Sequence, residues 1–132
     1  MAAFQPAIDA NNLEHATWLI NLISKEIPSA TVWSTRTAIC KSTQLFISKC
    51  VQTPELQVSE IVVDSLWESL KIVAGDRGYE NVRTAAAKAV AEFIRWVRAH
   101  PNWSGIQSRI ERELPGIIQA ETSSVIQAEY MK

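Results

Sequence analysis

Apolar residues recur every three or four positions along most of this chain, which is the spacing of a helix that buries one face. No segment alternates apolar and polar residues over a useful length, so we expect no β-strands. Proline and glycine clusters separate the periodic segments, because neither residue suits the interior of a helix. The pattern predicts helices over residues 12–27, 32–51, 55–74, 79–99, 104–114 and 117–130.

Several of the breaks between these helices have a clear physical basis. Pro28 ends the first helix. Thr53 and Pro54 suit the cap and the first position of the third helix. Pro115 and Gly116 should stop or bend the fifth helix, and the last helix follows them.

Part of the sequence occurs twice, with an offset of 47 residues that carries position 36 onto position 83. Apolar residues upstream of this stretch also fall on apolar residues under the same shift. A period in the forties that contains two helices is typical of helical-repeat solenoids. The best matches are Arg36-Thr37-Ala38 with Arg83-Thr84-Ala85, Lys41 with Lys88, and Phe46-Ile47 with Phe93-Ile94.

The repeat predicts an all-α fold of stacked antiparallel helical hairpins, an α-solenoid. We expect one helical-repeat domain over residues 1–132, with repeats at about 12–51 and 55–99 and a degenerate terminal half-repeat at about 104–130. Each hairpin buries its face against the next, so two repeats are few for a solenoid. We therefore interpret the chain as a piece of a longer solenoid or a small capped relative.

The segment over residues 81–90 resembles the second helix of a HEAT repeat, in which an acidic turn leads into a Val-Arg pair and an alanine-rich helix. Asp76 and Val82-Arg83 match this pattern, whereas Thr35 stands at the valine position of the first repeat. Trp33 and the Arg-Thr-Ala pattern are also similar to the family of large HEAT-repeat adaptors of the proteasome. These resemblances imply a scaffold or adaptor that holds a large partner, with the proteasome as one such complex.

Composition narrows the choice of partner and compartment. The 13 basic and 14 acidic residues leave a formal charge of -1, which gives no electrostatic case for nucleic acid or an anionic membrane. Cys40 and Cys50 lie on one predicted helix, separated by ~15 Å, so they should be reduced thiols, as in the cytoplasm or nucleus. We expect no secretory signal and no membrane span, because no long apolar run is present.

The residues that usually carry chemistry are sparse. His15 and His100 are the only histidines, and neither has a cysteine or carboxylate at zinc-ligand spacing. Both cysteines occupy apolar helical positions, which does not suit a catalytic Cys-His pair. No glycine-rich phosphate loop occurs. We therefore expect no enzyme, no metal and no cofactor.

Candidate partner contacts come from basic and aromatic residues. Lys88, Arg95 and Arg98 could share one side of the helix over residues 79–99, the side expected to line the concave face. Arg36 and Arg83 hold one repeat position and should pair with acids or carbonyls in adjacent turns, Asp76 being the expected neighbour of Arg83. Trp67 is expected in the core. Further candidate contacts are Trp18, Trp33, Trp96 and Leu19, the last on an apolar face with Ile20 and Ile23 that could remain exposed at the end of the stack and allow self-association.

The main hypothesis is a non-enzymatic protein–protein interaction scaffold that binds through a preformed curved helical surface. One alternative is a small ligand-binding or enzymatic helical bundle with a pocket between the helices at 55–74, 79–99 and 117–130. It needs polar residues on the inward stripe, where the sequence has alanine, valine, phenylalanine and leucine. A second alternative is a nucleic-acid-binding helical repeat, which needs a strongly basic face.

Overall fold

The computed structural model describes residues 20–26, 33–52, 58–76 and 79–130, and every regular element among them is a helix. Residues 20–26 form a first helical segment, which agrees with the expected helix over 12–27 as far as it is described. The later helices are α3 (Trp33–Val51), α4 (Glu60–Ala74), α5 (Glu80–Arg98), α6 (Ser104–Ala120) and α7 (Ser124–Tyr130). The prediction of an all-α fold is confirmed.

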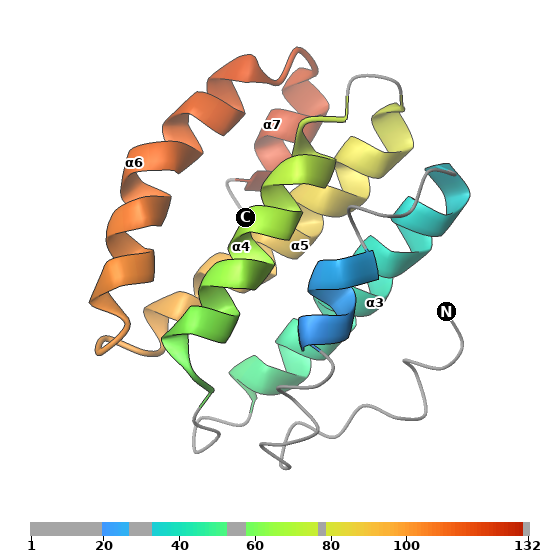
Figure 1. Cartoon of the computed structure of the whole chain (residues 1–132). Coiled ribbons are helices and arrows are strands. Elements are labelled where there is room, and N and C mark those ends of the chain that lie inside the picture. Colours follow the sequence, from blue (N-terminus) through green and yellow to red (C-terminus); the bar gives the residue numbers. More distant parts are fainter. Residues whose placement is uncertain (1–19, 27–32, 53–57, 77–78, 131–132) are drawn as a thin grey trace.

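The helices form two layers, as Figure 1 shows. One layer contains α3, α5 and α7, and the other contains residues 20–26, α4 and α6. At the centre of the stack, α5 packs against α3, α4, α6 and α7. The first segment is tied to α4 by a hydrogen bond of 3.0 Å, in which the Ser69 hydroxyl donates to the carbonyl of Ser24.

The repeat seen in the sequence is a repeat of structure. A shift of 47 residues carries the bounds of α3, at 33 and 51, onto those of α5, at 80 and 98. Phe46 and Phe93 occupy equivalent places in these helices, and both are buried. In the other layer Ile20 and Trp67 are equivalent, and both are fully buried. The stacked hairpins predicted from the sequence are therefore present.

Aromatic rings fill the centre of the second hairpin. The Trp67 ring stacks on Phe93 with centroids 5.6 Å apart, and Phe93 meets the edge of Trp96 at 6.3 Å. Beyond the end of α5, Trp103 folds back to meet Trp96 at 5.2 Å and stacks on His100 at 4.0 Å. The His100 ring also lies 3.0 Å from the Trp96 carbonyl through Nδ1. The turn after α5 thus belongs to the core.

The first turn of α4 differs from the expectation. We predicted a helix from about residue 55, but α4 begins at Glu60, and the expected cap at residues 53–54 lies outside the described residues. Val58 is buried although it precedes the helix. The carbonyl of Ser59 accepts the first hydrogen bond, from the backbone N–H of Val62 at 3.0 Å. Ser59, between Val58 and the helix, has extended backbone angles.

The end of α6 also differs, because the helix passes through Pro115 to Ala120 instead of stopping near 114. Proline removes one hydrogen bond to the carbonyl four residues earlier, here that of Glu111, and usually bends the helix. Glu111, Pro115 and Gly116 are all exposed, so this part of the helix lies at the surface. Figure 1 shows α6 curving toward α7 at its C-terminal end.

The last helix, α7, therefore starts at Ser124 and not near residue 117. The hydroxyl of Ser123 accepts a hydrogen bond of 3.4 Å from the backbone N–H of Ile126, as an N-terminal cap does. The amide of Gln127 donates to the carbonyls of Ile118 and Glu121 at 3.0 and 2.8 Å. These bonds satisfy one carbonyl in the last turn of α6 and the carbonyl of its C-terminal cap residue, so side chains bond both ends of the turn.

Candidate interaction surface

A groove runs along the outer side of the layer that contains α3 and α5, away from α4. It has a volume of about 600 Å³. We call it the α3–α5 groove. Its lining is polar apart from one alanine and one leucine: Thr37, Lys41, Gln44, Leu45, Asn81, Thr84, Ala85 and Lys88. A second, smaller hollow adjoins it and shares Gln44 and Lys88 with it.

Two lysines line the α3–α5 groove at the same repeat position. Lys41 on α3 and Lys88 on α5 are both exposed, and no described residue forms an ion pair with either. Both lysines therefore present a cation to this groove, one from each of the two neighbouring helices.

The cations predicted as partner contacts divide between different surfaces. Arg95 is exposed and forms an ion pair with Glu92 on its own helix, beside Lys88. Arg98 is exposed but lines a separate groove between α5 and α6. Ten residues of helix turn Arg98 about 80° from Lys88. Arg95 lies between them and lines one hollow with each, so the expectation that the three cations share one side of α5 stays a prediction. Arg83 is buried and does not join the exposed set.

The two repeated arginines pair with acids in adjacent turns, as the sequence predicts. The Arg36 guanidinium donates to the Asp76 carboxylate at 3.1 Å. Arg83 donates through Nε to the Glu121 carboxylate at 3.0 Å and through Nη1 to the Asp76 carbonyl at 3.1 Å. The Arg83–Glu121 pair is buried. These arginines therefore join each helix of one layer to the turn that precedes the next helix of the same layer.

The two acids have a second, equivalent role. Asp76 accepts a hydrogen bond of 3.1 Å from the backbone N–H of Tyr79, just before α5. Glu121 accepts one of 3.0 Å from the backbone N–H of Ser123, just before α7. Sequence reasoning missed Glu121. Its position in the turn after α6, about one repeat beyond Asp76, was the available signal.

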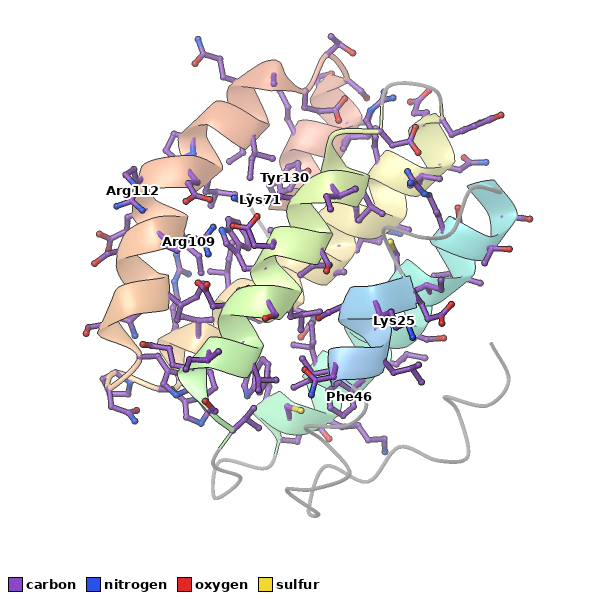
Figure 2. The ribbon with its side chains drawn as sticks, viewed as in Figure 1. Lys25, Phe46, Lys71, Arg109, Arg112 and Tyr130 are labelled. Atoms are coloured by element: carbon purple, nitrogen blue, oxygen red, sulfur yellow. The ribbon has the colours of Figure 1, made fainter. Side chains whose placement is uncertain are left out.

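A network of charges joins α4 to α6. The spacing of Asp64 and Glu68 predicts an ordinary solvated pair, but both carboxylates accept hydrogen bonds from Arg109 on α6, which corrects that interpretation. Arg109 also bonds Glu113 at 3.1 Å, and Lys71 bonds Glu113 at 2.6 Å. Figure 2 shows Lys71 and Arg109 in the space between the two helices. This network aligns two neighbouring helices of the same layer.

The network changes the acidity of its members. The hydrogen bond from Lys71 is the main reason that the pKa of Glu113 falls from 4.5 to about 2, with further bonds from Arg109 and Trp67, against the effect of burial. The indole of Trp67 donates to the Glu113 carboxylate at 3.0 Å. The carboxylate is therefore favoured over its protonated form in the folded chain.

The lowered pKa gives a testable dependence of stability on pH. We expect Glu113→Gln to lower the free energy of unfolding by about 1–2 kcal/mol above about pH 5, where the carboxylate is ionised in both states. A depressed pKa stabilises the fold only above the unfolded value, so the difference should shrink as pH falls from 4.5 towards 2. Urea unfolding of the wild type and of Glu113→Gln at several pH values measures this difference in the free energy of unfolding.

Glu111→Gln is the control, because Glu111 is exposed on α6, and its difference from wild type should not change with pH. A difference for Glu113→Gln that stays constant as the pH falls would contradict the account.

The predicted tryptophan contacts have different outcomes. Trp67 is fully buried, as expected. Trp96 is also fully buried between the rings of Phe93 and Trp103, so its prediction as a partner contact is wrong. Trp18 lies outside the described residues. Trp33 begins α3, and its side chain lies outside the described part of the structure.

The predicted apolar end of the stack is also corrected. Ile20 and Ile23 were expected on an exposed face, but both are buried in the main core. This face of the first helical segment packs against the rest of the core, so these two side chains form no exposed patch for self-association. Leu19 lies outside the described residues, and its role as a contact stays a prediction.

The cysteines show no sign of an activated thiol. Cys40 and Cys50 are free and fully buried, as expected from their helical spacing. Burial raises the pKa of each thiol to about 12. Within the described ranges there is no cluster of three potential metal-ligating side chains. None of the helices that the structure describes is long and apolar enough to span a membrane.

Two layers of stacked hairpins, joined by repeated arginine–acid contacts, define a helical-repeat protein of the armadillo-like class. A comparison with protein families is more specific: the model of the ECM29 C-terminal ARM-like repeats matches residues 1–132. The chain belongs to this family. Searches of curated proteins and of solved structures found no match. The narrower assignment to HEAT repeats stays a prediction.

Proposed function

We propose that this chain is a non-enzymatic interaction module, a scaffold or adaptor that binds an acidic segment of a partner protein in the α3–α5 groove. The observation that carries this proposal is the pair of exposed lysines, Lys41 and Lys88, at one repeat position and without an ion pair among the described residues. Leu45, which is half exposed, adds an apolar contact beside them. Carboxylates of a partner would form ion pairs with these lysines without breaking any ion pair between described residues of this chain.

The nature of the partner is also part of the proposal. The resemblance to large proteasome adaptors supports a large complex such as the proteasome, in the cytoplasm or the nucleus. A nucleic acid fits less well, since Glu92 and Glu129 line the hollow next to the groove and would repel a phosphate backbone. A protein segment suits such a mixed surface better than a nucleic acid does, because its carboxylates can lie near the lysines only, whereas every phosphate of a nucleic acid is charged.

Charge reversal tests the proposal. We expect the double variant Lys41→Glu with Lys88→Glu to weaken binding to purified proteasome by roughly tenfold or more, because two favourable pairs become repulsive. The measurement is co-sedimentation or surface-based binding at two salt concentrations, and the wild-type affinity should fall at the higher one. Lys25→Glu is the matched control, since Lys25 is exposed on the first helical segment and outside the groove. Unchanged binding of the double variant, or an equal loss with Lys25→Glu, would refute the proposal.

A further inference from the structure

The α3–α5 groove continues beyond Lys88 toward α7. The smaller hollow beside it, of about 250 Å³, shares Gln44 and Lys88 with the groove and adds Ala91, Glu92, Arg95 and Glu129. We call this second part the α7 hollow, because Glu129 belongs to α7, which packs beside α5 in the same layer (Figure 1). Groove and hollow together form one trough, which residues of α3, α5 and α7 line.

The trough follows one face of α5. The α5 residues that line it recur at helical spacing: Asn81, Thr84, Ala85, Lys88, Ala91, Glu92 and Arg95. In an α-helix these positions all lie within about 60° of Lys88 around the axis. The face from Asn81 to Arg95 is about 20 Å long, which equals about six residues of extended chain. The trough is therefore long enough for a short peptide segment.

The charge of the lining changes along this trough. Lys41 and Lys88 bring two cations to the α3–α5 groove, and no acidic residue of the described chain lines that part. Past Lys88, the carboxylates of Glu92 and Glu129 line the α7 hollow together with Arg95. Lys88 lies between the two parts, because it lines both. The trough is therefore purely basic at one end and mixed at the other.

The mixed end of the trough does not suit a uniformly acidic segment. Glu92 forms an ion pair with Arg95, so these two side chains largely cancel each other's charge. Glu129 brings a further carboxylate to the α7 side of the hollow. A segment with carboxylates along its whole length would bring one of them near Glu129, and like charges at close range repel. A basic side chain at that place would be attracted instead.

We propose that the trough binds a partner segment of ordered charge, with acidic residues toward Lys41 and Lys88 and a lysine or arginine beyond them toward Glu129. This inference rests on the function proposed above, because it concerns what the same groove binds. It makes the order of charges in the partner the feature that the trough selects. A shift of the segment along the trough would bring like charges together, so the same charges also fix its register.

Three blocked peptides of equal length test the order of charges. One has glutamates at its N-terminal end and lysines at its C-terminal end, the second has the reverse order, and the third has glutamates at both ends. Binding to the full chain is measured by fluorescence anisotropy at low salt, where ion pairs are least screened. One of the two mixed peptides should bind about fivefold more tightly than the other two peptides, because only its order suits Lys41, Lys88 and Glu129 together.

Variants of Glu129 show whether this carboxylate sets the preference. Glu129→Lys should reverse it, so that the all-glutamate peptide binds more tightly than either mixed peptide. Glu129→Gln, the milder change, should reduce the difference between the preferred mixed peptide and the all-glutamate peptide to within about twofold. Glu111→Lys is the matched control, since Glu111 is exposed on α6 and lines neither part of the trough, and it should keep the wild-type preference. Circular dichroism verifies that each variant remains folded.

The possible failures separate this inference from the function on which it rests. If the all-glutamate peptide binds the wild type most tightly, and reversing Lys41 and Lys88 to glutamate abolishes that binding, the inference is wrong and the proposed function stands. A preference that Glu129→Lys leaves unchanged, or that Glu111→Lys alters equally, would also overturn the inference alone. If no peptide binds, or if reversing both lysines changes no affinity, both proposals are wrong.

Discussion

Replacing Phe93 by alanine is expected to lower the free energy of unfolding by about 3–5 kcal/mol. The ring is fully buried, stacks on Trp67 and meets the edge of Trp96, so its loss leaves a cavity between α4 and α5. Rigid indole rings on two sides cannot collapse easily into that space. Urea or thermal unfolding, with circular dichroism as the signal, measures the change.

The repeat supplies its own comparison. Phe46→Ala should cost a similar amount, about 3–5 kcal/mol, because Phe46 fills the equivalent place on α3 and is also buried. Val125→Ala, at a side chain that is 72% exposed on α7, should change stability by less than about 0.5 kcal/mol. A surface-like cost at Phe93 or Phe46 would mean that the 47-residue alignment does not describe the packing.

Removing the carboxylate of Glu121 should be nearly as severe. Glu121→Ala leaves the Arg83 guanidinium buried without its ionic partner, and breaking a buried pair in this way costs about 3–5 kcal/mol. The same change removes the bond that Glu121 accepts from the backbone N–H of Ser123 before α7. Urea unfolding should therefore show a large loss of stability, together with weaker helical signal from the C-terminal end.

A second variant separates the charge from the packing. Arg83→Met combined with Glu121→Leu removes both charges and keeps apolar volume, so it should recover most of the loss. Glu92→Gln breaks the exposed pair with Arg95 and should cost less than about 1 kcal/mol. If Glu121→Ala costs no more than Glu92→Gln, the buried pair does not hold the turn as described. No recovery in the double variant would point to Ser123 and the cap instead.

Much of the fold could be predicted because the repeat and the helical spacing agree. The bounds of α5 follow from those of α3, and Phe46 and Phe93 carry the same role in both. The course of α6 could not be predicted, since a proline can either end a helix or merely bend it, and the residues alone do not decide between the two. The helix passes through Pro115 and ends where the Glu121 carboxylate pairs with Arg83.

The candidate surface was only partly predictable, for a related reason. The sequence repeat places Lys41 and Lys88 at equivalent positions. Whether a basic side chain forms an ion pair, however, depends on which acidic residues the packing brings near it. Arg95 meets Glu92 on its own helix, while the lysines meet no described acid. The burial of Trp96 depends on Trp103, which folds back from the next turn, and no periodicity within α5 reveals that contact.

The central claim is that the chain binds a protein partner through the α3–α5 groove. A photoreactive amino acid at Leu45, inside the groove, tests it against one at Ile72 on α4; the two side chains are 50% and 47% exposed. Each protein is mixed with purified proteasome, irradiated and analysed by mass spectrometry. The account predicts cross-links from position 45 to acidic segments of a proteasome subunit, and their loss when Lys41 and Lys88 are changed to glutamate. Cross-links from position 72 alone, or none from position 45, would contradict it.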